Sequence, residues 1–204
     1  MTLCYGPRVR TLPVEPAAVL LLLDVLLYRR LVQPDGAKDT DFVLHAKYTR
    51  EEARRLLRWS KEPNYQNIGG YFHDKETNTF PVFIDYEKDP SISITTMYED
   101  RFISENEIIA ISKSNRTLES PEIRKLKDAD SNGMRCYLFV RKNKDDKDDG
   151  KEFYFLGEMH PTGEFKQIVM HGTTTSAVEV AYRLEVPVRA DLYDCFLSDF
   201  NVDG

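Results

Sequence analysis

The chain has 204 residues, of which 41% are hydrophobic and 30% are charged, and its formal net charge at pH 7 is −6. This length and hydrophobic content are enough to bury a core, which excludes a natively unfolded chain. A protein that binds nucleic acid through bulk charge would be basic, so any contact with nucleic acid must be local and shaped.

The three cysteines, Cys4, Cys136 and Cys195, form no C-x-x-C pair, and an odd count fits no closed disulfide framework. We therefore expect free thiols and a cytoplasmic protein. No histidine is clustered with a cysteine, so we expect no structural zinc site. We also expect no other metal and no cofactor.

An apolar run covers residues 17–28 and is interrupted by Asp24. It has about 12 residues, whereas a helix that spans a membrane needs about 20, so we expect no membrane contact. Pro16 suits the first position of a helix, and Pro34-Asp35-Gly36 is a turn signal. The pattern predicts a helix over 16–31 that is either part of the core or a docking face for another domain.

A second helix is predicted to begin at Thr49, which forms a capping box with Glu52, and to end at Trp59. Its polar face is basic, with six basic and two acidic residues between Lys47 and Lys61. This face is either a solvated surface or a stripe that contacts phosphates. The candidates for phosphate contact are Arg50, Arg54 and Arg58.

From Ile68 onward the pattern changes to short strands separated by polar turns. The predicted strands are 69–72, 80–86, 92–97, 107–112, 135–141, 152–158 and 165–170. Residues 177–184 are predicted as a short strand or helix, and 191–200 as a helix. The fold class is therefore α+β, a bent antiparallel β-barrel with flanking helices. We expect residues 1–38 to form an N-terminal helical segment and residues 39–204 the β-barrel-like domain.

Motifs of the common enzyme classes are absent from the sequence. It has no G-x-x-x-x-G-K-[ST], no H-E-x-x-H and no G-x-S-x-G. His45-Ala46-Lys47 begins like a phosphodiesterase motif but lacks the aspartate that should follow. A metal-dependent nuclease using Asp85 and Glu87 stays open, although no spacer separates Glu87 from Lys88. We expect a binding domain with no catalytic residue.

Two neighbouring segments, 98–104 and 112–117, combine basic, acidic, hydroxyl, amide and aromatic side chains. Asp100 can accept a hydrogen bond from the exocyclic amine of a base, and aromatic rings can enclose an extruded base. Alternatively, Asp100 pairs with Arg101 or caps a turn, and the aromatic residues are core.

The glycines of segment 64–71 either allow close approach of a ligand or form a turn. The candidate residues are Asn67, Gly69, Gly70, Tyr71, Tyr86, Tyr98, Asp100, Arg101, Phe102, Ser112, Lys113, Ser114, Asn115 and Arg116, with Arg101, Lys113 and Arg116 as phosphate contacts.

The segments Tyr48–Glu52, Asn64–Tyr71, Lys75–Thr79, Tyr98–Ser104 and Ser112–Glu122 strongly resemble one bacterial family. It is a domain of unknown function at the C-terminus of superfamily-two, DEAD/DEAH-type helicases. The resemblance implies a PUA-like or SRA-like barrel that flips a modified base into an aromatic pocket.

By the same resemblance, the domain would be the target-recognition part of a type IV, modification-dependent restriction enzyme. The implied ligand is double-stranded DNA with 5-methylcytosine or 5-hydroxymethylcytosine. Helicase and nuclease domains would be its partners, in cis or in trans. The alternative function is a protein-interaction module that docks such a helicase or nuclease partner.

Overall fold

The structure is a computed structural model that describes residues 41–60, 71, 73–86, 100–142, 151–170 and 174–198. The predicted helix 16–31, the strand 92–97 and the proposed division at residue 38 lie outside the described residues. Within the described ranges, no helix is both long enough and apolar enough to span a membrane.

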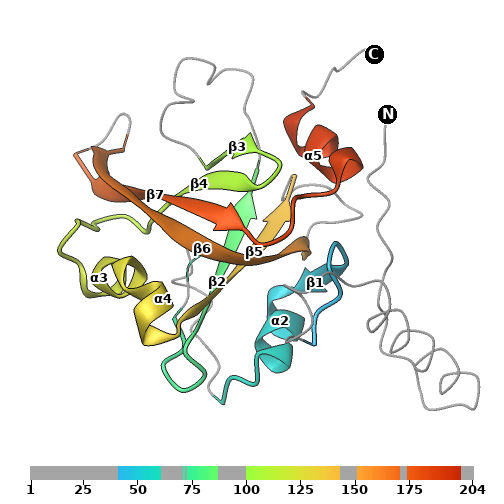
Figure 1. The fold of residues 1–204 in the computed structure, drawn as a ribbon, viewed down its shortest axis with the longest axis horizontal. Helices are drawn as coiled ribbons and strands as arrows, with labels where there is room; N and C mark the ends of the chain where they lie inside the picture. Colours follow the sequence, from blue (N-terminus) through green and yellow to red (C-terminus); the bar gives the residue numbers. More distant parts are fainter. Residues whose placement is uncertain are drawn as a thin grey trace, which may run out of the picture.

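The described elements are short helices and the strands of one sheet (Figure 1). In chain order they are β1 (Lys47–Thr49), α2 (Arg50–Leu56), β2 (Thr79–Asp85), β3 (Arg101–Ser104), β4 (Glu107–Ile111), α3 (Pro121–Lys127), α4 (Ala129–Asn132), β5 (Arg135–Arg141), β6 (Glu152–Val169), β7 (Ser176–Leu184) and α5 (Ala190–Leu197). The α+β class is therefore confirmed.

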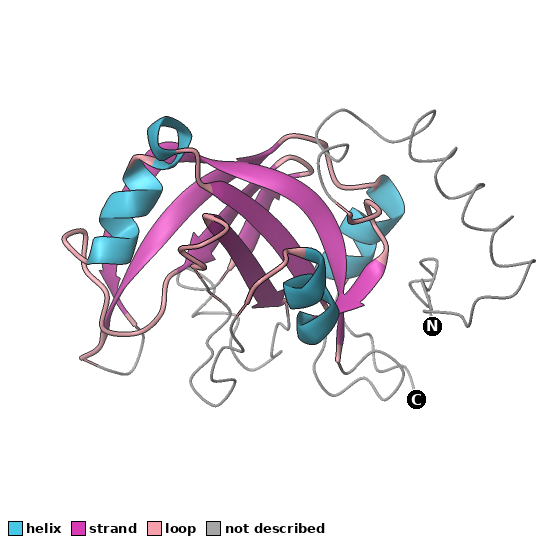
Figure 2. Cartoon of the chain, turned by 90° about the horizontal axis from the view of Figure 1, so that it is seen from below, coloured by secondary structure: helices cyan, strands magenta, loops and turns pink. Residues whose placement is uncertain are grey.

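The seven strands form one sheet in the order β2-β5-β6-β7-β4-β3, with β1 paired to β6. β2 and β5 are parallel, whereas the other pairs are antiparallel. The sheet is thus mixed, which corrects the antiparallel prediction. The long crossover from β2 to β5 lets those two strands run in the same direction. No pairing between described strands joins β2 to β3, so the sheet is strongly curved but not closed into the predicted barrel (Figure 2).

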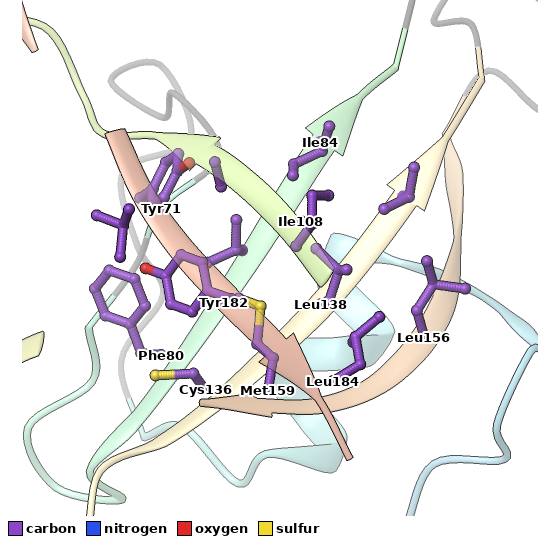
Figure 3. Packing of buried hydrophobic residues seen from close by; sticks show 14 of the residues in the cluster. Tyr71, Phe80, Ile84, Ile108, Cys136, Leu138, Leu156, Met159, Tyr182 and Leu184 are labelled. Carbon is purple, nitrogen blue, oxygen red and sulfur yellow. The ribbon is translucent and has the colours of Figure 1, made fainter. Parts of the chain in front are cut away.

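Successive side chains of a strand point to opposite faces of a sheet, and around β2, β5 and the first half of β6 both faces are buried. In β5, Cys136, Leu138 and Val140 pack in one cluster, which we call the inner core (Figure 3). Tyr137 and Phe139, which alternate with them, pack in a second cluster, the outer core. The inner core also receives apolar side chains from α3, α4 and α5, whereas the segment 42–59 covers the outer core.

β6 is the longest strand and joins two strands that the sequence pattern predicted separately. Opposite β5, its register shifts by one residue between Leu138 and Phe139, and the neighbouring Gly157 has a φ of +105°. Such a bulge bends a strand and increases its twist. A second register shift lies between Pro161 and Phe165 in the pairing with β7. β6 can therefore pair with β1, β5 and β7 while the sheet curves.

Local signals predicted several elements correctly. The capping box is present, since Glu52 N–H donates to Thr49 Oγ1 (3.1 Å) and Thr49 N–H donates to Glu52 Oε2 (2.8 Å). Residues 177–184 are strand, and α5 overlaps the predicted helix 191–200 from residue 191 to residue 197. Cys136 is a buried free thiol, but Cys195 is disulfide-bonded. The prediction of three free thiols is wrong there, because an odd count still permits one bridge.

Replacing Gly157 with alanine should destabilise the fold by about 1–3 kcal/mol, the usual cost of holding another residue in such a conformation. An added Cβ would also lie 3.2 Å from Leu44 Cδ1. Gly163→Ala is the matched control, because Gly163 has a φ of +91° but no atom within 4 Å of an added Cβ. Urea unfolding should show the larger loss for Gly157→Ala. Equal losses would mean that the contact with Leu44 contributes nothing.

Candidate nucleic-acid interface

The two edge strands of the curved sheet, β2 and β3, contact each other through side chains rather than strand pairing. The backbone N–H of Phe102 donates to the Tyr86 hydroxyl at 3.3 Å. The two rings lie 5.3 Å apart between centroids, and Phe102 stacks on Phe196 of α5. We call this region the seam and define it by Tyr71, Tyr86, Asp100 and Phe102. Tyr86 and Phe102 are buried there as core residues.

Two tyrosine hydroxyls on the inner side of the seam are buried without a hydrogen-bond partner among the described residues. They belong to Tyr71, which bridges to Val82 of β2, and to Tyr182 of β7 (Figure 3). Burial, followed by the charge of Asp100, raises the pKa of Tyr71 well above its usual value. Burial, together with Cys136 and Asp100, does the same to the pKa of Tyr182. Both hydroxyls therefore keep their protons and can donate to a ligand.

The Asp100 carboxylate is fixed at the start of β3. Its Oδ1 accepts a hydrogen bond from Ile111 N–H at the end of β4 at 2.7 Å, which is neither the turn cap nor the pairing with Arg101 that the sequence left as the alternative. It also raises the pKa of the Tyr71 hydroxyl, first through its charge and then through a side-chain hydrogen-bond interaction that falls short of strict hydrogen-bond geometry. A carboxylate has about four lone-pair sites, so Asp100 can accept from a ligand as well as from the backbone.

The basic loop 112–116 follows β4 directly and is anchored on β7. Ser112 exchanges two hydrogen bonds with the backbone of Val178, at 2.8 and 2.9 Å. Arg116 N–H donates to the carbonyl of Ser176 at 3.3 Å, and its guanidinium forms an ion pair with Glu122 of α3.

Within this loop, burial lowers the pKa of Lys113. Ser114 Oγ donates to Met170 Sδ at 3.4 Å, and Asn115 has a φ of +61°. The loop therefore lies next to Asp100, because Ile111, which donates to that carboxylate, immediately precedes Ser112.

Arg101 lies on the same edge of the sheet but is already matched by a carboxylate. Its Nη1 is 2.9 Å from Oε1 of Glu179 in β7, and the Glu179 side chain is only 6% exposed. Glu179 stands opposite Ile111 in the ladder between β4 and β7. Contact between Arg101 and a phosphate would compete with this ion pair, and it stays a prediction.

Arg50 and Arg54 of α2, and Arg58 in the turn that follows it, lie on the opposite face of the sheet from the seam. Arg50 lies over the rings of Phe83 and Phe153 in the outer core, and burial lowers its pKa. Arg54 is half-buried on the same helix. Arg58 is exposed and lies 3.6 Å from Asp41. The structure therefore separates Arg50, Arg54 and Arg58 from the seam and from loop 112–116.

Residues 42–196 match the family described as Domain of unknown function (DUF3427). The chain belongs to this family. A search of curated proteins finds no match.

Among solved structures, this DUF3427 domain is similar to the DNA recognition domain of the cytosine modification-dependent restriction endonuclease LpnPI. The TM-score is 0.48 and the identity 11%, over 72% of this chain and 75% of that one. It is also similar to the SUVH5 SRA domain in complex with fully methylated CG DNA. The TM-score is 0.42 and the identity 11%, over 70% of this chain and 90% of that one. For KRYPTONITE in complex with mCHG DNA and SAH, the TM-score is 0.46 and the identity 10%, over 86% of this chain and 39% of that one.

Four predicted site residues, Asn67, Gly69, Gly70 and Tyr98, lie outside the described residues. Tyr182 was not predicted as a site residue of the DUF3427 domain. It stands in an apolar strand with no polar motif beside it, so the sequence presents it as an ordinary core residue. Its unpartnered hydroxyl becomes visible only when the curved sheet places β7 near Asp100.

One group of described residues, Glu158, His160 and Glu185, places potential metal-ligand atoms within 4.8 Å of one another. Glu158 already accepts from Arg135 at 2.7 Å, and both ring nitrogens of His160 contact carboxylates. We therefore do not assign a metal to this group. The nuclease alternative would use Asp85 and Glu87. Asp85 forms an ion pair with Arg141, and Glu87 lies outside the described residues.

Tyr71→Phe should leave the free energy of unfolding unchanged or raise it, because it removes a buried hydroxyl whose desolvation costs about 1–3 kcal/mol when unpaired. The matched control is Tyr48→Phe in the outer core, where the hydroxyl accepts from Val43 N–H at 2.8 Å. Losing that bond should cost about 0.5–1.5 kcal/mol. Urea unfolding of both variants checks the contrast, and a larger loss for Tyr71→Phe would show that its hydroxyl has a partner.

Proposed function

We propose that this DUF3427 domain is a non-catalytic DNA-binding domain that recognises a modified cytosine extruded from the duplex and bound at the seam. The observation that carries the proposal is the pair of buried, unpartnered hydroxyls of Tyr71 and Tyr182 beside the Asp100 carboxylate. Buried polar groups are nearly always hydrogen-bonded, to protein, ordered water or a ligand, and two such hydroxyls beside one carboxylate support the proposal that a polar ligand binds there.

The three groups are complementary to the Watson–Crick edge of cytosine. That edge offers one donor, the N4 amine, and two acceptors, N3 and O2. Asp100 supplies an acceptor for the amine, and the two protonated tyrosine hydroxyls supply donors for N3 and O2. Thymine has an acceptor in place of the amine and would face the carboxylate unfavourably. The apolar side chains of the inner core around the hydroxyls suit a substituent at C5.

Access for a base requires the seam to open. In the described part of the sheet, β2 and β3 share no strand pairing, and the contacts between them include the 3.3 Å hydrogen bond from Phe102 to Tyr86 and their ring contact. Opening this edge leaves the ladders β2–β5 and β4–β7 intact. Extruding a base costs a few kcal/mol, which the hydrogen bonds at the seam would offset.

The backbone of the DNA would be held by loop 112–116, which places Lys113 and Arg116 close to the seam. This arrangement is consistent with a net charge of −6, because the contact depends on a few cations at one place. In a type IV restriction system the domain would then supply target recognition, while helicase and nuclease activities lie on other domains.

Fluorescence anisotropy with matched duplexes that carry cytosine, 5-methylcytosine or 5-hydroxymethylcytosine tests the proposal. We expect one modified duplex to bind more tightly than the unmodified duplex at both low and high salt, because backbone contacts alone weaken steeply with salt. Equal affinity for all three duplexes, or no binding, would contradict it.

Asp100→Asn should weaken binding of the preferred duplex by about tenfold or more, because a hydrogen bond to a charged group contributes about 1.5–3 kcal/mol. The asparagine oxygen can still accept from Ile111 N–H, so the fold should persist. Tyr182→Phe should cost about two- to tenfold, as expected for a neutral hydrogen bond. Tyr48→Phe is the control that should leave DNA affinity unchanged. Wild-type discrimination in both Asp100→Asn and Tyr182→Phe would exclude the seam as the base site.

Lys113→Ala should weaken binding to all three duplexes alike and reduce the slope of log K against log salt by about 0.9, the contribution of one phosphate contact. Arg58→Ala is the matched control on the opposite face of the sheet. It should leave the slope unchanged if the DNA contacts the seam side alone. A smaller slope for Arg58→Ala would instead show that the basic face around α2 contacts DNA, one of the two alternatives open from the sequence.

A further inference from the structure

His160 of β6 is held between carboxylates from two different parts of the chain. Its Nδ1 lies 3.2 Å from Asp130 Oδ1 in α4, and its Nε2 lies 3.1 Å from Glu185 Oε1 immediately after β7. A neutral imidazole has one N–H and can donate only one hydrogen bond, whereas an imidazolium donates two. With a carboxylate acceptor at each nitrogen, the geometry is that of a charged histidine.

The surroundings of the ring favour the same protonation state. The charged groups around His160 are Asp130 from α4, Glu158 from β6, which pairs with Arg135 of β5 at 2.7 Å, Glu185 and, opposite it in the β6–β7 ladder, Arg183. Arg183 donates to Glu107 at 2.8 Å, so its charge is already matched by a carboxylate. Burial alone would lower the pKa of His160, but the hydrogen bonds to Glu185 and Asp130 and the charge of Glu158 outweigh it and raise the pKa.

The contact with Asp130 fastens a small helical unit to the sheet. α3 and α4 together insert Ile123, Leu126 and Ala129 into the inner core. At the start of α3, Glu122 forms an ion pair with Arg116 of the basic loop. The unit is thus tied to the rest of the domain by an ion pair near each end, and only the one at α4 involves a group that titrates near neutral pH.

We propose that protonated His160 is a pH-sensitive clasp that holds α4 and the end of β7 against β6. Loss of the ring proton loosens α4, which Ala129 in the inner core and the hydrogen bond from Asn78 Nδ2 to the Asn132 carbonyl still attach. The direction follows from the raised pKa. The clasp contributes its full stability below the pKa of an unfolded histidine, about 6.5. That contribution is lost as the pH rises through the higher pKa of the folded state. This inference is independent of DNA binding.

Proton NMR of the imidazole resonances, assigned with His160→Gln, tests the proposal in the full chain. We expect His160 to titrate above pH 6.5 and its midpoint to fall in both Asp130→Asn and Glu185→Gln. His45 is the internal reference, because burial and Arg189 lower its pKa to about 4. A midpoint for His160 at or below 6.5, or one unchanged in both variants, would overturn the proposal.

Hydrogen exchange of the α4 amides supplies the second readout, compared between wild type and His160→Gln after correction for intrinsic exchange rates. At pH 5.5, wild type should protect α4 more strongly than His160→Gln, and the difference should vanish once the pH exceeds the wild-type midpoint. The same protection in both proteins at pH 5.5 would show that the ring holds nothing in place, which contradicts the clasp.

Discussion

The curvature of the sheet is the constraint on which the rest of the structure depends. β6 pairs along its length with β1, β5 and β7, and the bulge beside Gly157 lets it do so while changing direction. Because the sheet curves, its two edge strands β2 and β3 approach each other on the inner face, where Phe102 N–H meets the Tyr86 hydroxyl. A flat sheet of the same strand order would hold these edges four strands apart.

The curved sheet also keeps the basic residues of α2 apart from those of loop 112–116. The arginines of α2 cover the outer core, while Asp100, the two unpartnered tyrosines and loop 112–116 gather around the inner core. A net acidic protein can therefore present basic groups at one place beside a buried polar site. Base-specific recognition needs this combination, since phosphate contacts give affinity and base contacts give specificity.

The sequence predicted what local chemistry decides. Thr49 and Glu52 predicted the start of α2, and the predicted strand 135–141 has the same bounds as β5. Non-local pairing was not predictable in the same way. The parallel pairing of β2 with β5 depends on a crossover of many residues, and β6 looked like two strands because Pro161 and Gly163 resemble breaks between them.

The candidate site shows the same difference between local signals and non-local contacts. Tyr71 and Asp100 were chosen for their chemistry, and the fold brings them together. Tyr182 had no local signal, and the partner that matches Arg101 lies 78 residues away in β7. Sequence patterns thus identified polar groups of the right kind, but only the fold shows which of them lack or have partners.

The most direct test of the account is NMR of protein labelled with carbon-13 at tyrosine Cζ, titrated with a duplex that carries a single 5-methylcytosine. If the base binds at the seam, the Cζ resonances of Tyr71 and Tyr182 should shift, because their hydroxyls gain hydrogen bonds, while that of Tyr48 in the outer core should not. Binding that shifts backbone resonances of loop 112–116 but leaves those of Tyr71 and Tyr182 unchanged would contradict the account. It would mean that the domain contacts phosphates without binding a base at the seam.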